Sequence, residues 1–307
     1  MPKKSPGKAQ KQTPKHARAA GWNDPLLPQQ PLVSGRWLLS ALTGVVALGA
    51  VCAYGTLCLL FYQGSWQLIF HPSHTVSATP SVSYQEIRFD YTETGKPQLT
   101  GWWIPAAPGA RYSGSTIVLL HDGRGSLSDT VPQLQALHLL GINLFAFDYR
   151  GFGKSVGLHP SETSLNQDAD AALAYLTGTR HLPAHSILLY GSGLGASVAA
   201  STAARHADIP GVILDGIAPD ALTILSADAR TRILPVRLLT SDRFEIAAAL
   251  KSLRAPKLFL TGGDSMLTVK AYQNASDPKQ LFSVAAEDQA QYQKVMSDFL
   301  DGLRLQP

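Results

Sequence analysis

The stretch Leu188–Ala200, LLYGSGLGASVAA, decides the fold of this chain because it joins an apolar run to a helix-like run with almost nothing between them. The apolar run, Ile187–Tyr190, has the length and continuity of a buried strand. The second run, Leu194–His206, is predicted to be helical. Only three small residues separate the two runs, so the sequence predicts a tight strand-to-helix turn.

Outward from this turn, short β-rich runs alternate with helix-like stretches over the whole chain after Pro72. The predicted strands are Ser83–Tyr91, Leu99–Ile104, Thr116–Leu120, Asn143–Phe147, Ile187–Tyr190, Val212–Leu214, Lys257–Thr261 and Gln280–Val284. The predicted helices are Asp129–Leu140, Thr163–Leu176, Leu194–His206, Arg243–Leu253, Leu267–Asn274 and Asp288–Leu303. The alternation predicts a three-layer α/β/α sandwich around a mostly parallel, eight-stranded sheet.

Within this sheet, the first two strands are expected to form an antiparallel pair, and the remaining strands are expected to be parallel and buried. Runs such as IVLL, LFAF and ILLY are continuously apolar, which is typical of strands covered on both faces. Residues 216–242 show no clear period and are predicted to be a short excursion over the top of the sheet.

The segment Trp37–Tyr62 contains no charged residue and is long enough, at about 1.5 Å per residue, to span a hydrocarbon core of about 30 Å. Trp37 at one end, with Tyr62 and Trp66 at the other, suits the two membrane interfaces. A cleavable signal peptide fits poorly because its charged region would be 36 residues long. A buried helix, apolar all round, is rare in soluble domains. We therefore predict a transmembrane signal anchor at residues 37–62.

The net charge of +4 is unevenly distributed. Residues 1–36 hold seven of the 26 Lys and Arg side chains and one acid, whereas the rest of the chain has 19 basic and 21 acidic residues. The positive-inside rule then predicts a disordered cytoplasmic tail at residues 1–36 and a folded domain at residues 63–307 on the extracytoplasmic side, periplasmic or lumenal. The near-neutral domain gives no indication of nucleic-acid binding, and the bilayer is the expected partner.

The only two cysteines, Cys52 and Cys58, lie inside the apolar segment. Six residues apart on a helix, they point to different faces and cannot form a disulfide with each other. We predict no metal site, no redox pair and no cofactor.

Five motifs, in this order along the chain, resemble those of the α/β-hydrolase superfamily, in particular its membrane-anchored ABHD-type and serine-aminopeptidase-like members. They are QLIFHP (Gln67–Pro72), LLHDGRGS (Leu119–Ser126), FDYRGFGKSVGLHPSE (Phe147–Glu162) with Asp168, LLYGSGLGASVAA (Leu188–Ala200) and DRFEIAAALKSLRAPKLFLTG (Asp242–Gly262). The resemblance covers residues 67–303. It implies a serine hydrolase fold in which the second motif borders the oxyanion hole and the fourth carries the nucleophile.

The fourth motif departs from the family pattern at the nucleophile. The family turn reads G-x-S-x-G, with small residues two positions before and after a strained nucleophile. Here Gly191 and Gly195 stand at those positions, so Gly193 rather than Ser192 occupies the nucleophile position. Shifting the register by one would put Tyr190 and a leucine where glycines are needed. The turn is predicted to persist without its attacking atom.

The family's base is missing as well, because the triad order is nucleophile, acid, histidine and none of the nine histidines follows His206. Glu287 and Asp288 stand where the histidine is expected, and a carboxylate is a poor base for a serine hydroxyl at neutral pH. Asp264 is interpreted either as a relic of the triad acid or as a loop or capping residue.

The oxyanion hole is predicted to survive as backbone N–H groups of Leu194 and of Gly123 or Asp122. Asp122 replaces the glycine usual in the family, and its carboxylate would oppose an oxyanion. His121 is expected to orient this loop rather than act as a base. Arg150 with Asp168 is interpreted as structural, and His159 as a solvated loop residue.

The leading hypothesis is therefore a catalytically degenerate hydrolase domain that binds a small acyl- or peptide-like ligand above Gly193, or a protein partner. The alternative is an active esterase or peptidase with a relocated constellation, such as Ser192 or Asp122 with His121 or His159. A third hypothesis is an interaction protein that works through its outer helices.

Overall fold

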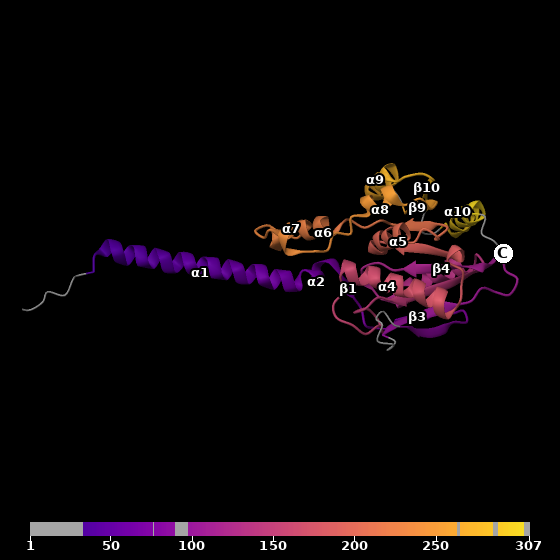
Figure 1. Ribbon diagram of the computed structural model, residues 1–307, viewed down its shortest axis with the longest axis horizontal. Coiled ribbons are helices and arrows are strands. Elements are labelled where there is room, and N and C mark those ends of the chain that lie inside the picture. The colour runs from indigo at the N-terminus through magenta and orange to yellow at the C-terminus, as the bar shows by residue number, and fades with distance from the viewer. Residues whose placement is uncertain (1–32, 76, 90–97, 263–264, 285–287, 304–307) are drawn as a thin grey trace, which may run out of the picture. The chain divides into compact units, whose positions relative to one another are not determined.

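The computed structural model describes residues 33–75, 77–89, 98–262, 265–284 and 288–303. Its main sheet has the strand order β10-β9-β8-β7-β4-β6-β3-β2. Figure 1 shows β3 and β10 on opposite sides of β4. The strands are β2 Gln85–Phe89, β3 Leu99–Ile104, β4 Tyr112–Leu120, β6 Ile142–Asp148, β7 Ile187–Ser192, β8 Val212–Asp215, β9 Lys257–Thr261 and β10 Lys279–Ser283. The predicted eight-stranded sheet is confirmed.

Strand directions also follow the prediction. β2 pairs with β3 antiparallel, β3 pairs with β6 antiparallel, and the other pairs are parallel. The strand predicted at Thr116 begins earlier, at Tyr112, and its register against β6 shifts between these two residues. A two-residue parallel pair, β1 His71–Pro72 with β5 Arg124–Gly125, was not predicted because so short a pairing has no periodicity.

Helices cover both faces of the sheet. On one face, α3 Val131–His138 and α10 Gln289–Gly302 pack on side chains such as Leu119, Leu188 and Leu258. On the other face, Val118 and Leu189 belong to a second core. That core is completed by α4 Glu162–Ala174, α5 Leu194–Arg205, α8 Ile246–Ser252 and α9 Met266–Asn274. Short turns η1 Leu127–Thr130, η2 Tyr175–Thr179 and η3 Ala184–Ser186 adjoin these elements.

The excursion at residues 216–242 contains α6 Ala221–Ala227, the turn η4 Ala229–Thr231 and α7 Val236–Leu239. Helices of seven and four residues are too short to show a helical period in the sequence. The excursion is therefore present as predicted, but its two short helices were not predicted.

The chain divides into two compact units, Met1–Gly55 and Thr56–Pro307. The predicted apolar helix is α1, Gly35–Gly64, followed by the short α2, Trp66–Ile69. No residue of α1 is buried, and its most apolar 18-residue window has a mean hydropathy of 2.1. By length and composition α1 could serve as a membrane anchor.

Candidate functional site

The strand-to-helix turn lies at the carboxyl end of β7. Gly193 is the N-cap of α5 and has φ 59° and ψ −121°, a backbone conformation that residues other than glycine rarely adopt. Its N–H donates to the carbonyl oxygen of Asp215 on the neighbouring strand, at 3.0 Å. The tip of the turn is therefore Gly193, as the spacing of the two flanking glycines predicts.

The flanking glycines permit a close backbone approach. A Cβ on Gly195 would lie 2.5 Å from the carbonyl oxygen of His121 and would overlap that of Leu120. A Cβ on Gly191 would lie 2.6 Å from the Cα of Ala196. Because backbone atoms cannot move aside cheaply, β7, α5 and the loop after β4 depend on glycine at both positions.

The side chain of Asp122 fills the space above Gly193. A Cβ on Gly193 would overlap the Asp122 carboxylate and would lie 2.9 Å from its Cβ. Asp122 Oδ1 also accepts a hydrogen bond of 2.8 Å from the N–H of Leu194, the first residue of α5. A helix N-terminus is a favourable place for an anion. The N–H group predicted to serve an oxyanion hole is thus already bound to a carboxylate of the same chain.

The loop around Asp122 is held from several sides. His71 N–H donates to the carbonyl oxygen of Gly123 at 2.8 Å, and a Cβ on Gly123 would lie 2.5 Å from Leu194 Cδ1. His121 Nδ1 lies 2.7 Å from the carbonyl oxygen of Asp122, so the interaction expected to orient this loop is present.

His121 is enclosed by aromatic side chains. Its ring centroid is 4.6 Å from that of Tyr149 and 5.1 Å from that of Phe152, and only 2% of the residue is exposed. Burial lowers the pKa of His121, and Nε2 has no hydrogen-bond partner among the described residues. His159 is exposed and stacks on Trp66, with ring centroids 5.4 Å apart.

The hydrogen bonds of the described residues join Ser192 to neither His121 nor His159. Asp122 likewise bonds to the Leu194 N–H and not to an imidazole. In the described structure, the groups named for a relocated constellation are therefore not joined to one another by hydrogen bonds.

Arg150 and Asp168 form a structural pair, as the sequence indicates. The guanidinium donates through Nε at 2.8 Å and Nη2 at 2.5 Å to Oδ1 of the aspartate, and the Arg150 N–H donates to Oδ2 at 2.8 Å. Burial raises the pKa of Asp168, although the bonds from Arg150 act in the opposite direction. The pair ties the loop after β6 to α4.

Of the acidic positions predicted from the triad order, Asp264 and Glu287 lie outside the described residues. Asp288 is the N-cap of α10, and its Oδ1 accepts from the Gln291 N–H at 2.9 Å. Aspartate is a preferred capping residue, so this structural role could have been predicted from its place before the helix.

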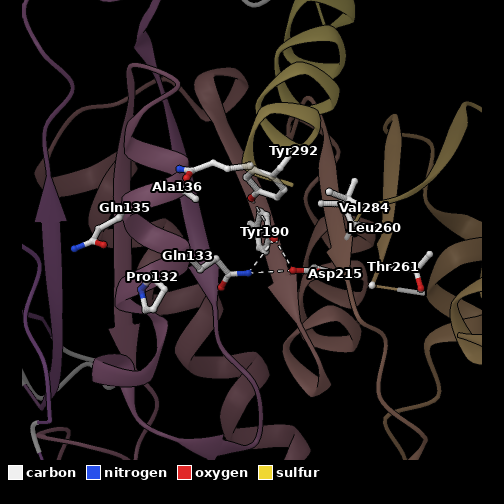
Figure 2. Close-up of a pocket in the computed structure, with 12 residues that line it drawn as sticks. Pro132, Gln133, Gln135, Ala136, Tyr190, Asp215, Leu260, Thr261, Val284 and Tyr292 are labelled. Atoms are coloured by element: carbon white, nitrogen blue, oxygen red, sulfur yellow. Dashed lines mark hydrogen bonds between the residues drawn. The ribbon is translucent and has the colours of Figure 1, made fainter. Parts of the chain in front are cut away.

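A cavity of about 620 Å³ opens beside the turn, between α3 and α10, at the carboxyl ends of β7, β8 and β9 (Figure 2). The residues that line it are Pro132, Gln133, Gln135, Ala136, Tyr190, Asp215, Leu260, Thr261, Gly262, Val284, Gln289 and Tyr292. Neither Gly193 nor Asp122 is among them, although Ser192 pairs in register with Asp215. The ligand space predicted above Gly193 is thus filled, and the open space lies to one side.

Four polar side chains form a network in this cavity. Tyr190 Oη donates to Asp215 Oδ2 at 2.7 Å, and Gln133 Nε2 donates to both, at 2.9 and 3.1 Å (Figure 2). The hydroxyls of Tyr190 and Tyr292 are 3.4 Å apart. Burial raises the pKa of Asp215 and raises those of both tyrosines further above their ordinary values.

Sequence reasoning missed this network. Its signal is the polar residue at the carboxyl end of each apolar strand, Tyr190 after ILL and Asp215 after VIL, which is where open α/β sheets bind ligands. Among the described residues, no group of three or more His, Cys, Asp or Glu side chains is placed to hold a metal ion.

Comparison with known proteins agrees with the observed fold. The family model of serine aminopeptidase, S33, matches residues 113–224. An uncharacterized Mycobacterium tuberculosis protein, Rv2307c, is 30% identical over 241 residues, which cover 76% of this chain and 83% of the relative. WAV2 of Arabidopsis thaliana, an alpha/beta hydrolase domain-containing protein, is 23% identical over 70% of this chain and 74% of its own.

Among solved structures, the Pyrococcus furiosus esterase Pf2001 superposes with a TM-score of 0.59 at 20% identity, over 76% of this chain and 97% of the esterase. An alpha-beta hydrolase from Vibrio vulnificus gives 0.55 at 22% identity, over 72% and 80% of the two chains. The fold, the strand-to-helix turn and these relatives define the class. The chain belongs to the α/β-hydrolase superfamily.

Proposed function

We propose that this protein is a catalytically inactive member of the superfamily, anchored in a membrane by α1, whose hydrolase domain binds a ligand or partner on the extracytoplasmic side. The observation that carries the proposal is the position of the Asp122 carboxylate. It takes both the space of a nucleophilic side chain at position 193 and the hydrogen bond from Leu194 N–H.

This arrangement opposes acyl transfer in two ways. A substrate carbonyl can receive the Leu194 N–H only if the carboxylate leaves, and a carboxylate nearby repels the negative charge that develops on the carbonyl oxygen. The base is missing too, since no histidine follows His206 and His121 is enclosed by Tyr149 and Phe152. The proposed inactivity thus involves the nucleophile, the oxyanion hole and the base.

Ligand binding is supported by the cavity of about 620 Å³ beside the turn. Volumes of this order suit small-molecule sites, which combine apolar walls with a few polar groups. Leu260 and Val284 contribute apolar wall, while Asp215 and Tyr292 contribute a hydrogen-bond acceptor and a hydroxyl. A small acyl- or peptide-like ligand, with an apolar part and an amide or hydroxyl donor, fits this lining.

The decisive experiment is labelling of the full-length protein, purified in detergent, with a fluorophosphonate probe, together with hydrolysis of a p-nitrophenyl ester. We expect no labelling and only background hydrolysis, with the Pyrococcus furiosus esterase as a positive control. Stoichiometric labelling that is lost in Ser192→Ala would show an active enzyme and refute the proposal.

Orientation is tested separately, by fusing alkaline phosphatase after Pro307. The positive-inside distribution of residues 1–36 predicts an active fusion, because this phosphatase needs an oxidising compartment. An inactive phosphatase fusion with a fluorescent cytoplasmic reporter at the same site would overturn the topology.

A further inference from the structure

The excursion between β8 and α8 exposes two large apolar side chains. Ile233 is 66% exposed, and Leu238 in α7 is 83% exposed. Other apolar side chains of this domain, such as Leu139, are as exposed, so the exposure of this pair matters only together with the charged groups around it.

Three arginines lie close together in this segment. Arg230, Arg232 and Arg237 are all exposed, and within residues 228–238 the one acid is Asp228, which pairs with Arg230 at 2.6 Å. Among the described residues, Arg232 and Arg237 form no ion pair. The 230–238 patch, defined as Arg230, Arg232, Ile233, Arg237 and Leu238, is thus basic and apolar within a domain that is otherwise close to neutral.

A hollow of about 350 Å³ lies within this patch. Arg232 and Arg237 line it together with Ser226, Thr231 and Leu238. The Thr231 hydroxyl donates to the carbonyl oxygens of Leu225 and Asp228, so the groups that can face a ligand are the two guanidinium groups, the Ser226 hydroxyl and the Leu238 side chain. They match the phosphate and the upper acyl chain of a phospholipid.

The location of the patch identifies its occupant. α6 packs against α2, which directly follows α1. Leu239, the last residue of α7, lines a second hollow of about 290 Å³ with Tyr62, near the end of α1, and Trp66, the first residue of α2. With α1 as a membrane anchor, Tyr62 and Trp66 are expected at the lipid interface, and Leu239 shares a hollow with both.

We propose that the 230–238 patch docks on the anionic phospholipid surface of the membrane in which α1 is anchored. Ile233 and Leu238 insert at the headgroup boundary, as the apolar face of an interfacial helix does, and the arginines bind lipid phosphates. The inference rests on the proposed anchor and goes beyond it, since docking fixes the orientation of the hydrolase domain on the bilayer.

The test uses the full chain with Cys52→Ser and Cys58→Ser, reconstituted in nanodiscs of phosphatidylcholine alone or with phosphatidylglycerol. An environment-sensitive fluorophore is attached at Leu238→Cys, and quenching is measured with lipids that carry a nitroxide near the headgroup. Leu139→Cys is the matched control. Leu139 is 67% exposed, but it lies before the amino end of β6, whereas the excursion leaves the carboxyl end of β8. In this parallel part of the sheet, the two ends face opposite sides of the domain.

We expect strong quenching at position 238 in discs containing phosphatidylglycerol, falling to the level of position 139 without it. The change Arg232→Glu with Arg237→Glu should have the same effect as removing the anionic lipid. Quenching at 238 that never exceeds the control, or that is equal in both lipids, overturns the proposal; the former result would favour a protein partner. Protein that fails to remain in the discs refutes the anchor as well, whereas protein that remains but is unquenched refutes only the docking.

Discussion

The strand-to-helix turn and the neighbouring cavity both adjoin the carboxyl end of β7, yet different contacts hold them together. At the turn, Gly193 has φ 59° and the Asp122 carboxylate fills the space that a Cβ on Gly193 would take. In the cavity, the polar side chains remain and face open volume, with Asp215 bonded to Tyr190 and Gln133.

The difference lies in the contacts that hold each region together, which are backbone contacts at the turn and side-chain hydrogen bonds in the cavity. The turn depends on close backbone contacts that the fold needs, so glycine at positions 191 and 195 serves packing whether or not a nucleophile is present. The cavity network is held instead by hydrogen bonds between side chains, which satisfy its buried polar groups. The proposed ligand binding therefore belongs to the cavity, whereas the contacts at the turn serve packing.

The largest effect is expected for Gly195→Ala, which tests the structural role of the turn. The added methyl group would meet the carbonyl oxygens of Leu120 and His121, so we expect a loss of about 3 kcal/mol or more, or failure to fold. Thermal unfolding of the full chain measures this loss. Ser192→Ala is the matched control and should change stability by less than about 0.5 kcal/mol. Equal effects of the two changes would contradict the proposed packing.

Gly193→Ser is expected to cost about 2–4 kcal/mol, because serine must adopt a strained conformation and also displace the Asp122 carboxylate. Adding Asp122→Gly should restore part of this loss, with a coupling of about 1–2 kcal/mol in a double-mutant cycle. Ester hydrolysis should stay at background in both variants, since no histidine follows His206. Additive stability effects would show that Asp122 does not occupy this space.

Tyr190→Phe tests whether the hydrogen-bond network in the cavity is preorganised. It removes the hydroxyl that donates to Asp215 at 2.7 Å, so we expect a loss of about 1 kcal/mol in chemical denaturation. Tyr84→Phe, on a tyrosine whose ring packs on Trp102, is the control and should be near neutral. A neutral Tyr190→Phe would indicate that water replaces the bond and that the network is not preorganised.

A smaller effect is expected from the pH dependence of His121. Because burial lowers its pKa in the folded state, the unfolded chain binds the proton more readily, and stability is lost as pH falls below about 6.5. His121→Gln should flatten the fall in melting temperature between pH 7 and pH 5, while His185→Gln, on an exposed histidine, should not. Identical pH profiles for all three proteins would refute the role of burial.

The smallest effect, with the opposite sign, is expected at Asp215. Burial raises its pKa in the folded state, so the stability that protonation supplies is lost as pH rises above the unfolded value of about 4. Asp215→Asn keeps an oxygen that accepts from Tyr190 and Gln133, and it should remove this loss without lowering stability at pH 7. A marked destabilisation at neutral pH would mean that the charge itself is needed.

Much of the fold could be predicted because most strands and helices follow from hydrophobic patterns along the sequence. The strands Leu99–Ile104 and Lys257–Thr261 were predicted to the residue, since each holds a compact apolar run, WWI or LFL, and is preceded or followed by a proline. The pairing of His71–Pro72 with Arg124–Gly125 could not be predicted, since two residues carry no period. The short helices α6 and α7 were missed for a related reason.

The sequence by itself determined the family, the apolar helix and the glycine at position 193, because each is a matter of composition, order and spacing along the chain. Only the tertiary structure decided that Asp122 binds the N–H of Leu194, 72 residues away, and that Tyr190 and Asp215 meet over one cavity. These contacts depend on strand order and on which face each side chain occupies. Strand order arises from packing over the whole sheet, and no local pattern encodes it.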